Sequence, residues 1–205
     1  MGRPRVRLNR RCLVCGLWRE RCVCAELPRA AFRTRILVVQ HAAERFKPTN
    51  SGRLLAHMVE GAQVLLFGAK NVTFDARPLA DPEVDWRVLF PRPQAEVLGP
   101  GVQGRKGRRL GLVLLDGTWH QATRMARRVP GVADLPFVTL PEGPPPVWTV
   151  RTQHLAHGRS TFEAGLDALE ALEGASTTAL LRDAFVRHAD RLLRLKGKSS
   201  RTVTH

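Results

Sequence analysis

Short apolar runs recur along the chain and predict the strands of a buried sheet. Each run is rich in Val, Ile, Leu or Phe and is bounded by polar, Gly or Pro residues. Such continuous apolar character is typical of strands that are covered on both faces, as in parallel sheets. The predicted strands are Ile36–Gln40, Val64–Phe67, Val84–Phe90, Leu112–Leu115 and Phe137–Leu140, and a further apolar stretch, Val147–Val150, follows the Pro-rich residues 141–146.

Amphipathic stretches with helix start and stop signals lie between and after these strands. Asn50 or Ser51 is a suitable N-cap for the first of them, and Gly61 is a suitable stop. The predicted helices run from Gly52 to about Glu60, over about ten residues from Thr118, over Thr161–Glu173 and over Thr177–Leu195. Strands that alternate with helices predict an α/β domain with a mainly parallel sheet and flanking helices.

The length of 205 residues and the 43% hydrophobic content suit one folded domain with a small addition. Residues 1–33 hold every cysteine and many arginines, so they form a distinct N-terminal element. Residues 34–195 carry the periodic pattern of a globular domain. Residues 196–205 are basic and polar, and we expect this tail to be disordered.

The charge balance points to a polyanionic partner. The chain has 33 Lys and Arg against 18 Asp and Glu, which gives a net charge of +15. A surface of this kind attracts nucleic acid. Codon bias is an alternative source of the excess of Arg over Lys, but it does not explain the net charge. No apolar run approaches the roughly 20 residues that span a bilayer, and the N-terminus lacks a secretory apolar region, so we expect a cytoplasmic protein.

The four cysteines have the spacing C-x2-C-x6-C-x-C and predict a structural zinc site. Cys12 and Cys15 form one close pair, and Cys22 and Cys24 form a second, tighter pair. Two such pairs supply the four thiolates of a tetrahedral zinc ion and leave no position open for catalysis. Unligated thiols are the alternative. The arginines around the cysteines make this block a candidate contact for RNA.

The sequence Asp116-Gly117-Thr118-Trp119 follows the most apolar predicted strand. Ligands of open α/β sheets bind at the carboxyl ends of strands, where a carboxylate is placed to act as a general base. Trp119 offers a flat face on which an adenine or a nucleobase stacks. The structural alternative is that Asp116 or Thr118 caps the next helix and that Trp119 belongs to the core.

Two further polar segments also join a strand or loop to a helix. Residues 41–53 contain small polar residues before a helix together with Arg45, Lys47 and Arg53, which suit phosphate. A helix cap with solvated charges is the alternative. In the second segment, Ser160 and Glu163 have the spacing of a capping box, so Glu163 is either a helix cap or part of a site.

Taken together and in one order, these segments resemble the DTW-domain family. The similarity extends from Cys12 to about Ala164. It comprises the cysteine block, H-x-x-E…T-N-S-G-R at 41–53, D-G-T-W at 116–119 and S-T-F-E-A at 160–164. Two positions differ from the residues that are common in the motifs of the family. Ala follows His41 where Pro is frequent, and Ser160 stands where Cys often occurs.

The resemblance implies a SPOUT-like fold whose C-terminal half is threaded as a trefoil knot. It also implies a reaction in which the 3-amino-3-carboxypropyl group of S-adenosylmethionine moves to N3 of a tRNA uridine. The products are acp3U and 5'-methylthioadenosine. The expected partner is therefore tRNA, and the expected oligomeric state is a monomer.

By the same resemblance, Asp116 is the expected catalytic residue, because uridine N3 carries a proton that must be accepted. Arg151 is expected to hold the carboxylate of S-adenosylmethionine bidentately. The residues expected at S-adenosylmethionine are Thr118, Trp119, Leu140, Arg151, Leu155, Ser160 and Thr161. Those expected at the uridine or its phosphates are His41, Glu44, Arg45, Asn50, Ser51 and Arg53.

Two other functions compete with this interpretation. A SPOUT-type methyltransferase would use the same S-adenosylmethionine but would leave S-adenosylhomocysteine. A zinc-containing RNA-binding protein without catalysis would explain the basic N-terminal element and the Gly-Arg loop at 104–109 equally well. It would bind RNA in a salt-sensitive manner and would have no affinity for S-adenosylmethionine.

Overall fold

The computed structural model describes residues 10–143 and 158–195. Six strands form one sheet in the order β2-β1-β5-β3-β6-β4, and every neighbouring pair is parallel. The strands are β1 (Arg35–His41), β2 (Gln63–Phe67), β3 (Val84–Leu89), β4 (Glu96–Val97), β5 (Arg109–Asp116) and β6 (Phe137–Thr139). The predicted α/β class with a parallel sheet is confirmed.

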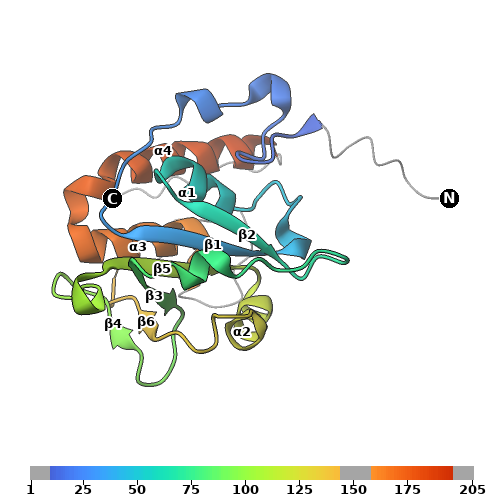
Figure 1. The fold of residues 1–205 in the computed structure, drawn as a ribbon. Coiled ribbons are helices and arrows are strands. Elements are labelled where there is room, and N and C mark those ends of the chain that lie inside the picture. Colours follow the sequence, from blue (N-terminus) through green and yellow to red (C-terminus); the bar gives the residue numbers. More distant parts are fainter. Residues whose placement is uncertain (1–9, 144–157, 196–205) are drawn as a thin grey trace.

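Helices cover both faces of this sheet (Figure 1). They are α1 (Gly52–Met58), α2 (Trp119–Arg128), α3 (Thr161–Glu173) and α4 (Ala175–Leu195). Successive side chains of a strand point to opposite faces. Ile36 and Val38 of β1 therefore pack with α1, α3 and α4 on one face. Leu37 and Val39 pack with α2 on the other.

The N-terminal cysteine block packs into the core that lies under α1, α3 and α4. Cys15, Leu17, Val23 and Phe32 are buried and belong to the same apolar cluster as these helices. The chain of this block runs over the helical layer before it enters β1 (Figure 1). Its apolar residues therefore contribute to the domain core as well as to the cysteine cluster.

Several boundaries differ from the sequence-based expectation. β5 begins at Arg109, inside the stretch interpreted as a Gly-rich loop, because Arg109 pairs with Val84 at the start of β3. The two-residue strand β4 was not predicted, since so short an edge strand has no periodicity of its own. Helix α4 begins at Ala175, earlier than expected.

The stretch Val147–Val150 and the tail 196–205 lie outside the described residues. So does part of the C-terminal half in which a trefoil knot is expected, and the knot stays a prediction. Within residues 10–143 and 158–195, no helix combines the length and the apolar character needed to cross a membrane.

Gly111 is the position at which the sheet leaves no room for a side chain. It lies opposite Trp86 in the β3–β5 register. A Cβ atom at Gly111 would lie 2.5 Å from Cε3 of Trp86 and 2.5 Å from Cγ1 of Val84. Both neighbours are buried in the cluster beside α2, so neither has space to move away.

We predict that Gly111→Ala lowers the free energy of unfolding by about 1–3 kcal/mol, because it overpacks a filled core. Urea unfolding monitored by circular dichroism measures the change. Gly101→Ala is the matched control, since nothing lies within 4 Å of a Cβ atom there. Equal midpoints for the two variants would show that Trp86 does not constrain this strand.

Candidate functional site

Asp116 ends β5 at the carboxyl edge of the sheet and is only 3% exposed. Its Oδ2 accepts hydrogen bonds from Gln40 Nε2 at 2.9 Å and from Asn50 Nδ2 at 2.5 Å. Its Oδ1 accepts a hydrogen bond from Thr161 Oγ1 at 2.7 Å. A carboxylate has about four lone-pair positions. Three donors from three chain segments therefore occupy most of the acceptor capacity of Asp116.

The segment before α1 is fixed against this carboxylate. Asn50 Oδ1 accepts hydrogen bonds from Gln40 Nε2 and from the backbone N–H of Arg53, while its amide nitrogen binds Asp116. A Cβ atom at Gly52 would lie 2.6 Å from the Asp116 carboxyl carbon. Ser51 Oγ accepts the backbone N–H of Phe162. The N-termini of α1 and α3 therefore meet at Asp116.

Arg53 and Glu44 stabilise the segment internally. The Arg53 guanidinium donates hydrogen bonds to the backbone carbonyls of Arg45 and Lys47. Burial lowers the pKa of Arg53, and the nearby Asp116 carboxylate opposes that shift. Glu44 is buried and accepts a hydrogen bond from Lys47 Nζ at 2.5 Å. Among the predicted uridine-binding residues, Glu44, Asn50, Ser51 and Arg53 thus make contacts that build the segment, while the Arg45 side chain is exposed.

Three hydroxyl residues expected at S-adenosylmethionine organise helix starts. Thr118 is the N-cap of α2 and forms a capping box with Gln121. Ser160 is the N-cap of α3, and Glu163 completes a capping box with it. Thr161 directs its hydroxyl to Asp116. The capping interpretation is therefore confirmed for Thr118 and for Glu163, whereas Asp116 caps neither helix.

Trp119 is 54% exposed, which excludes the alternative that it belongs to the core. Its ring stacks on Phe90, with the ring centroids 5.1 Å apart and an interplanar angle of 23°. Phe90 follows β3, the neighbour of β5, so the pair sits at the same carboxyl edge as Asp116. Phe90 thus packs against one face of the Trp119 ring, and a large part of the indole is exposed and available to a planar ligand.

The remaining predicted residues fall in different places. His41 ends β1 and its Nδ1 accepts the backbone N–H of Ala43 at 3.2 Å. Leu140 is half-buried and packs against the core that contains α3. Arg151 and Leu155 lie outside the described residues.

Gln40 and Phe90 are site residues that the sequence analysis did not single out. Gln40 is a buried amide at the end of an apolar strand, and the register places it directly beside Asp116. The polar end of the run I-L-V-V-Q was a signal, but it did not reveal which strand would be its neighbour. Phe90 looked like an ordinary strand residue, and only its stacking on Trp119 gives it a place at the edge.

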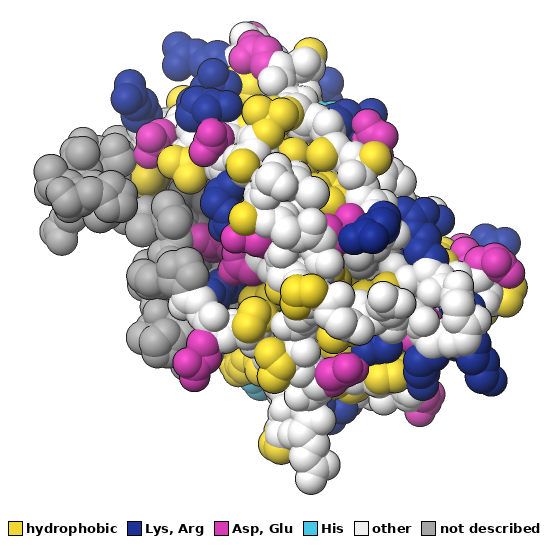
Figure 2. All heavy atoms as spheres, turned by 90° about the vertical axis from the view of Figure 1, so that its left-hand side faces the viewer, with side chains coloured by type: hydrophobic (Ala, Val, Ile, Leu, Met, Phe, Trp, Pro, Cys, Tyr) yellow, Lys and Arg dark blue, Asp and Glu magenta, His cyan; other side chains and the backbone are white. Residues whose placement is uncertain are grey.

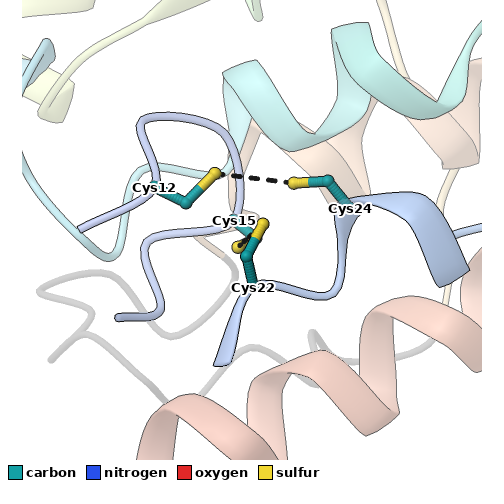
Figure 3. A group of neighbouring side chains, drawn as sticks. All are labelled: Cys12, Cys15, Cys22 and Cys24. Atoms are coloured by element: carbon teal, nitrogen blue, oxygen red, sulfur yellow. Dashed lines mark hydrogen bonds between the residues drawn. The ribbon is translucent and has the colours of Figure 1, made fainter. Parts of the chain in front are cut away.

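The four cysteines form a second site on the N-terminal block (Figure 3). Their sulfur atoms all lie within 4.8 Å of one another. The Cys12–Cys24 and Cys15–Cys22 pairs are separated by 3.6 and 3.8 Å. Four thiolates at about 2.3 Å from a tetrahedral zinc ion are about 3.8 Å apart, so the cluster fits zinc. The structure therefore supports a metal-binding site made of four cysteines.

The electrostatics of the thiols agree with metal binding. Although burial opposes the shift, hydrogen bonds from the backbone of Cys15 and Val14 lower the pKa of Cys12 to about 7. Burial and the neighbouring Cys12 sulfur raise the pKa of Cys24. Without a metal, Cys12 therefore loses its proton more readily than its close neighbour Cys24. A divalent cation would favour the thiolate form of all four cysteines.

The N-terminal cysteine block contacts the segment that surrounds Asp116. Gly16 lies in the left-handed region with φ +72°, and a Cβ atom there would lie 1.9 Å from the backbone oxygen of Pro48. Pro48 precedes Asn50 by two residues. In addition, His57 of α1 lies 3.1 Å from the backbone oxygen of Cys24 through its Nε2. The cysteine block therefore contacts both the segment before α1 and the last turn of α1.

Comparisons with known proteins place these features in a family. The family model described as "DTW domain" matches residues 9–193, which include the four cysteines, the segment before α1, Asp116 and the start of α3. No solved structure matches the chain.

We predict that the purified protein holds about one zinc ion per chain and that Cys22→Ser reduces this occupancy. The thermal midpoint should fall with it, because structural zinc contributes folding free energy directly. Metal analysis and differential scanning fluorimetry measure the two quantities.

Wild-type protein that is stripped with a chelator and then given zinc again is the control, and its midpoint should recover. A metal-free protein with an unchanged midpoint, or one with a Cys12–Cys24 disulfide, would contradict a structural metal role.

Proposed function

This chain belongs to the DTW domain family, and on that premise we propose that it transfers the 3-amino-3-carboxypropyl group of S-adenosylmethionine to N3 of a tRNA uridine. The products are acp3U and 5'-methylthioadenosine. The family supports a tRNA-modifying function in general. The observation that carries the specific proposal is the pairing of Asp116 and exposed Trp119 at the end of one central strand.

The residues at the carboxyl edge fit a ligand with an adenine and an amino acid moiety. Trp119 is exposed and supported by Phe90, so it offers a face for stacking of the adenine. Helix α3 begins at Thr161, beside Asp116, and the positive end of its helix dipole suits an anionic group. Arg151, which lies outside the described residues, is retained as the proposed bidentate partner of the methionine carboxylate.

S-adenosylmethionine supplies an activated carbon next to its sulfonium sulfur. The protein's task is to select which of the three carbons faces the nucleophile, and orientation of the ligand makes that choice. A cofactor clamped between Trp119 and the start of α3 would present its methionine arm to the RNA. The bond from sulfur to the γ-carbon breaks as the bond from uridine N3 forms, and the sulfur leaves as methylthioadenosine.

Asp116 is the proposed acceptor of the N3 proton. Among the described residues, its Oδ1 accepts a hydrogen bond from the Thr161 hydroxyl alone, which leaves one of its lone pairs for a substrate proton. Gln40 and Asn50 hold Oδ2, so the orientation of the carboxyl plane is fixed before substrate arrives. Such fixed geometry reduces reorganisation during proton transfer.

Zinc is proposed as the metal of the four-cysteine site, with a structural role only. Four thiolate ligands leave no coordination position for substrate. The contact between Gly16 and Pro48 makes the site a support for Asn50 and, through Asn50, for Asp116.

Incubation of the protein with S-adenosylmethionine and unmodified tRNA should yield methylthioadenosine, identified by mass spectrometry. The product should appear only when tRNA is present. S-adenosylhomocysteine in its place would replace the proposed reaction with methylation. Absence of both products, combined with salt-sensitive tRNA binding, would favour the RNA-binding protein without catalysis.

Asp116→Asn should retain tRNA binding and lower the single-turnover rate by about 10²–10⁴-fold, the usual contribution of a general base. The same change should cost about 1–3 kcal/mol of stability, because buried donors then face an amide nitrogen. Rates are therefore compared at a temperature at which both proteins are folded.

The pH dependence of the transfer rate distinguishes proton acceptance by Asp116 from a role in positioning its neighbours. If Asp116 accepts the proton, the rate of the variant should rise by about tenfold per pH unit, because N3 must then ionise in solution. The wild-type rate should rise less steeply. Parallel pH profiles for the two proteins would show that Asp116 acts only by positioning its neighbours.

A further inference from the structure

Helix α2 presents an outer face on which cations and an aromatic ring are exposed. Its buried residues, Ala122, Met125 and Ala126, recur at helical spacing and pack against the sheet. The exposed residues on the opposite side are His120, Arg124, Arg127 and Arg128, and Trp119 is exposed at the start of the helix. Because α2 starts at Trp119, the last residue of D-G-T-W, this face continues outward from the candidate site.

No carboxylate of the described residues lies within ion-pairing distance of the arginines of this face. Helix α2 contains no Asp or Glu. Within residues 10–143 and 158–195, Arg124, Arg127 and Arg128 make no ion pair or hydrogen bond through their side chains. Their charges are therefore not neutralised by the part of the protein that the structure describes.

On the opposite, helical layer, two of the four arginines of α4 form ion pairs. Arg182 of α4 lies 2.9 Å from Asp167 and 2.7 Å from Glu170 of α3. Arg191 of α4 lies 3.6 Å from Glu26. Helix α4 also contains Asp183 and Asp190, so its surface holds carboxylates that the α2 surface lacks.

The amino edge of the sheet is balanced as well, although the sequence suggested a basic RNA-binding loop there. The buried Asp85 carboxylate binds Arg105 at 2.7 Å and lies 3.5 Å from Arg108. Arg109 donates to the backbone carbonyls of Phe32 and Arg33. Figure 2 shows this side of the molecule, where acidic and basic side chains are interspersed.

Helix stability does not explain Arg124 of α2. Cations in the last turn interact favourably with the helix dipole, which accounts for Arg127 and Arg128. Arg124 lies earlier, and like charges at i,i+3 and i,i+4 destabilise a helix by about 0.2–0.5 kcal/mol per pair. Arg124 forms such a pair with each of the other two. The charge pattern therefore fits an external anion better than it fits the helix.

We propose that the outer face of α2 is the surface along which the tRNA backbone docks. This inference rests on the proposed function, because it takes tRNA as the polyanion. A helix of this length spans about 15 Å at 1.5 Å per residue, enough to contact several successive phosphates. Planar guanidinium groups suit phosphate oxygens. A backbone held by Arg124, Arg127 and Arg128 would lead toward Trp119 and Asp116.

The test compares two triple variants of the full chain that carry the same change in net charge. Arg124→Gln/Arg127→Gln/Arg128→Gln removes the exposed charges of α2. Arg187→Gln/Arg191→Gln/Arg194→Gln removes three exposed charges from α4, on the other face of the sheet. Affinity for unmodified tRNA is measured over a series of salt concentrations without S-adenosylmethionine. Thermal unfolding verifies that both variants are folded.

The α2 variant should bind tRNA at least about tenfold more weakly at low salt. The slope of log K against log salt should be shallower by about 2–3, one unit for each phosphate that the protein no longer neutralises. The α4 variant should stay close to wild type in both quantities. Equal losses of tRNA affinity in the two variants would show that the whole basic surface attracts the RNA without a preferred face. An unaffected α2 variant would show that the RNA binds elsewhere. Either result overturns the proposal.

Because S-adenosylmethionine is omitted, the binding result is independent of the transfer reaction. Loss of binding in the α2 variant alone would support this surface even if wild-type protein released no methylthioadenosine. In that case the proposed reaction would fail and the docking surface would stand. Methylthioadenosine release by the wild-type protein, together with full tRNA binding by the α2 variant, would instead support the reaction and overturn the docking surface.

Discussion

The buried carboxylate of Asp116 is the interaction on which the candidate site depends. It receives hydrogen bonds from the end of β1, from the segment before α1 and from the first turn of α3. Gln40 and Thr161 are far apart in the chain, and both bind this carboxylate. A buried anion is costly unless donors surround it. The need to satisfy Asp116 therefore fixes how α1 and α3 begin, and with them the shape of the carboxyl edge.

The N-terminal cysteine block extends this constraint to the start of the chain. It adds apolar residues to the core under α1, α3 and α4, and it contacts Pro48 through a glycine that tolerates no side chain. Pro48 lies two residues before Asn50, whose amide binds Asp116. A metal ion that holds the block in shape would thus support the site without taking part in the reaction. This arrangement gives a physical reason for a small four-cysteine element beside the α/β domain.

The basic surfaces of the molecule differ in whether carboxylates lie beside their arginines. At the amino edge and on α4, carboxylates lie beside several of the arginines. These ion pairs reduce the positive electrostatic potential of the two surfaces. On α2 the arginines are exposed without such partners among the described residues, next to an exposed Trp119. The high net charge alone did not distinguish these surfaces. The positions of Asp85 and Asp167 did, because a nearby carboxylate cancels most of the attraction of an arginine for a polyanion.

The sequence by itself determined the α/β class, most strands and helices, the cysteine cluster and the capping boxes, because these follow from periodicity and short-range spacing. Residue similarity also identified the family, which the match over 9–193 supports. Only the tertiary structure decided that Gln40 lies beside Asp116 and that Arg105 is neutralised by Asp85. Those contacts depend on strand order and register, which join residues distant in the chain. Local spacing carries no information about which distant partner a polar side chain will meet.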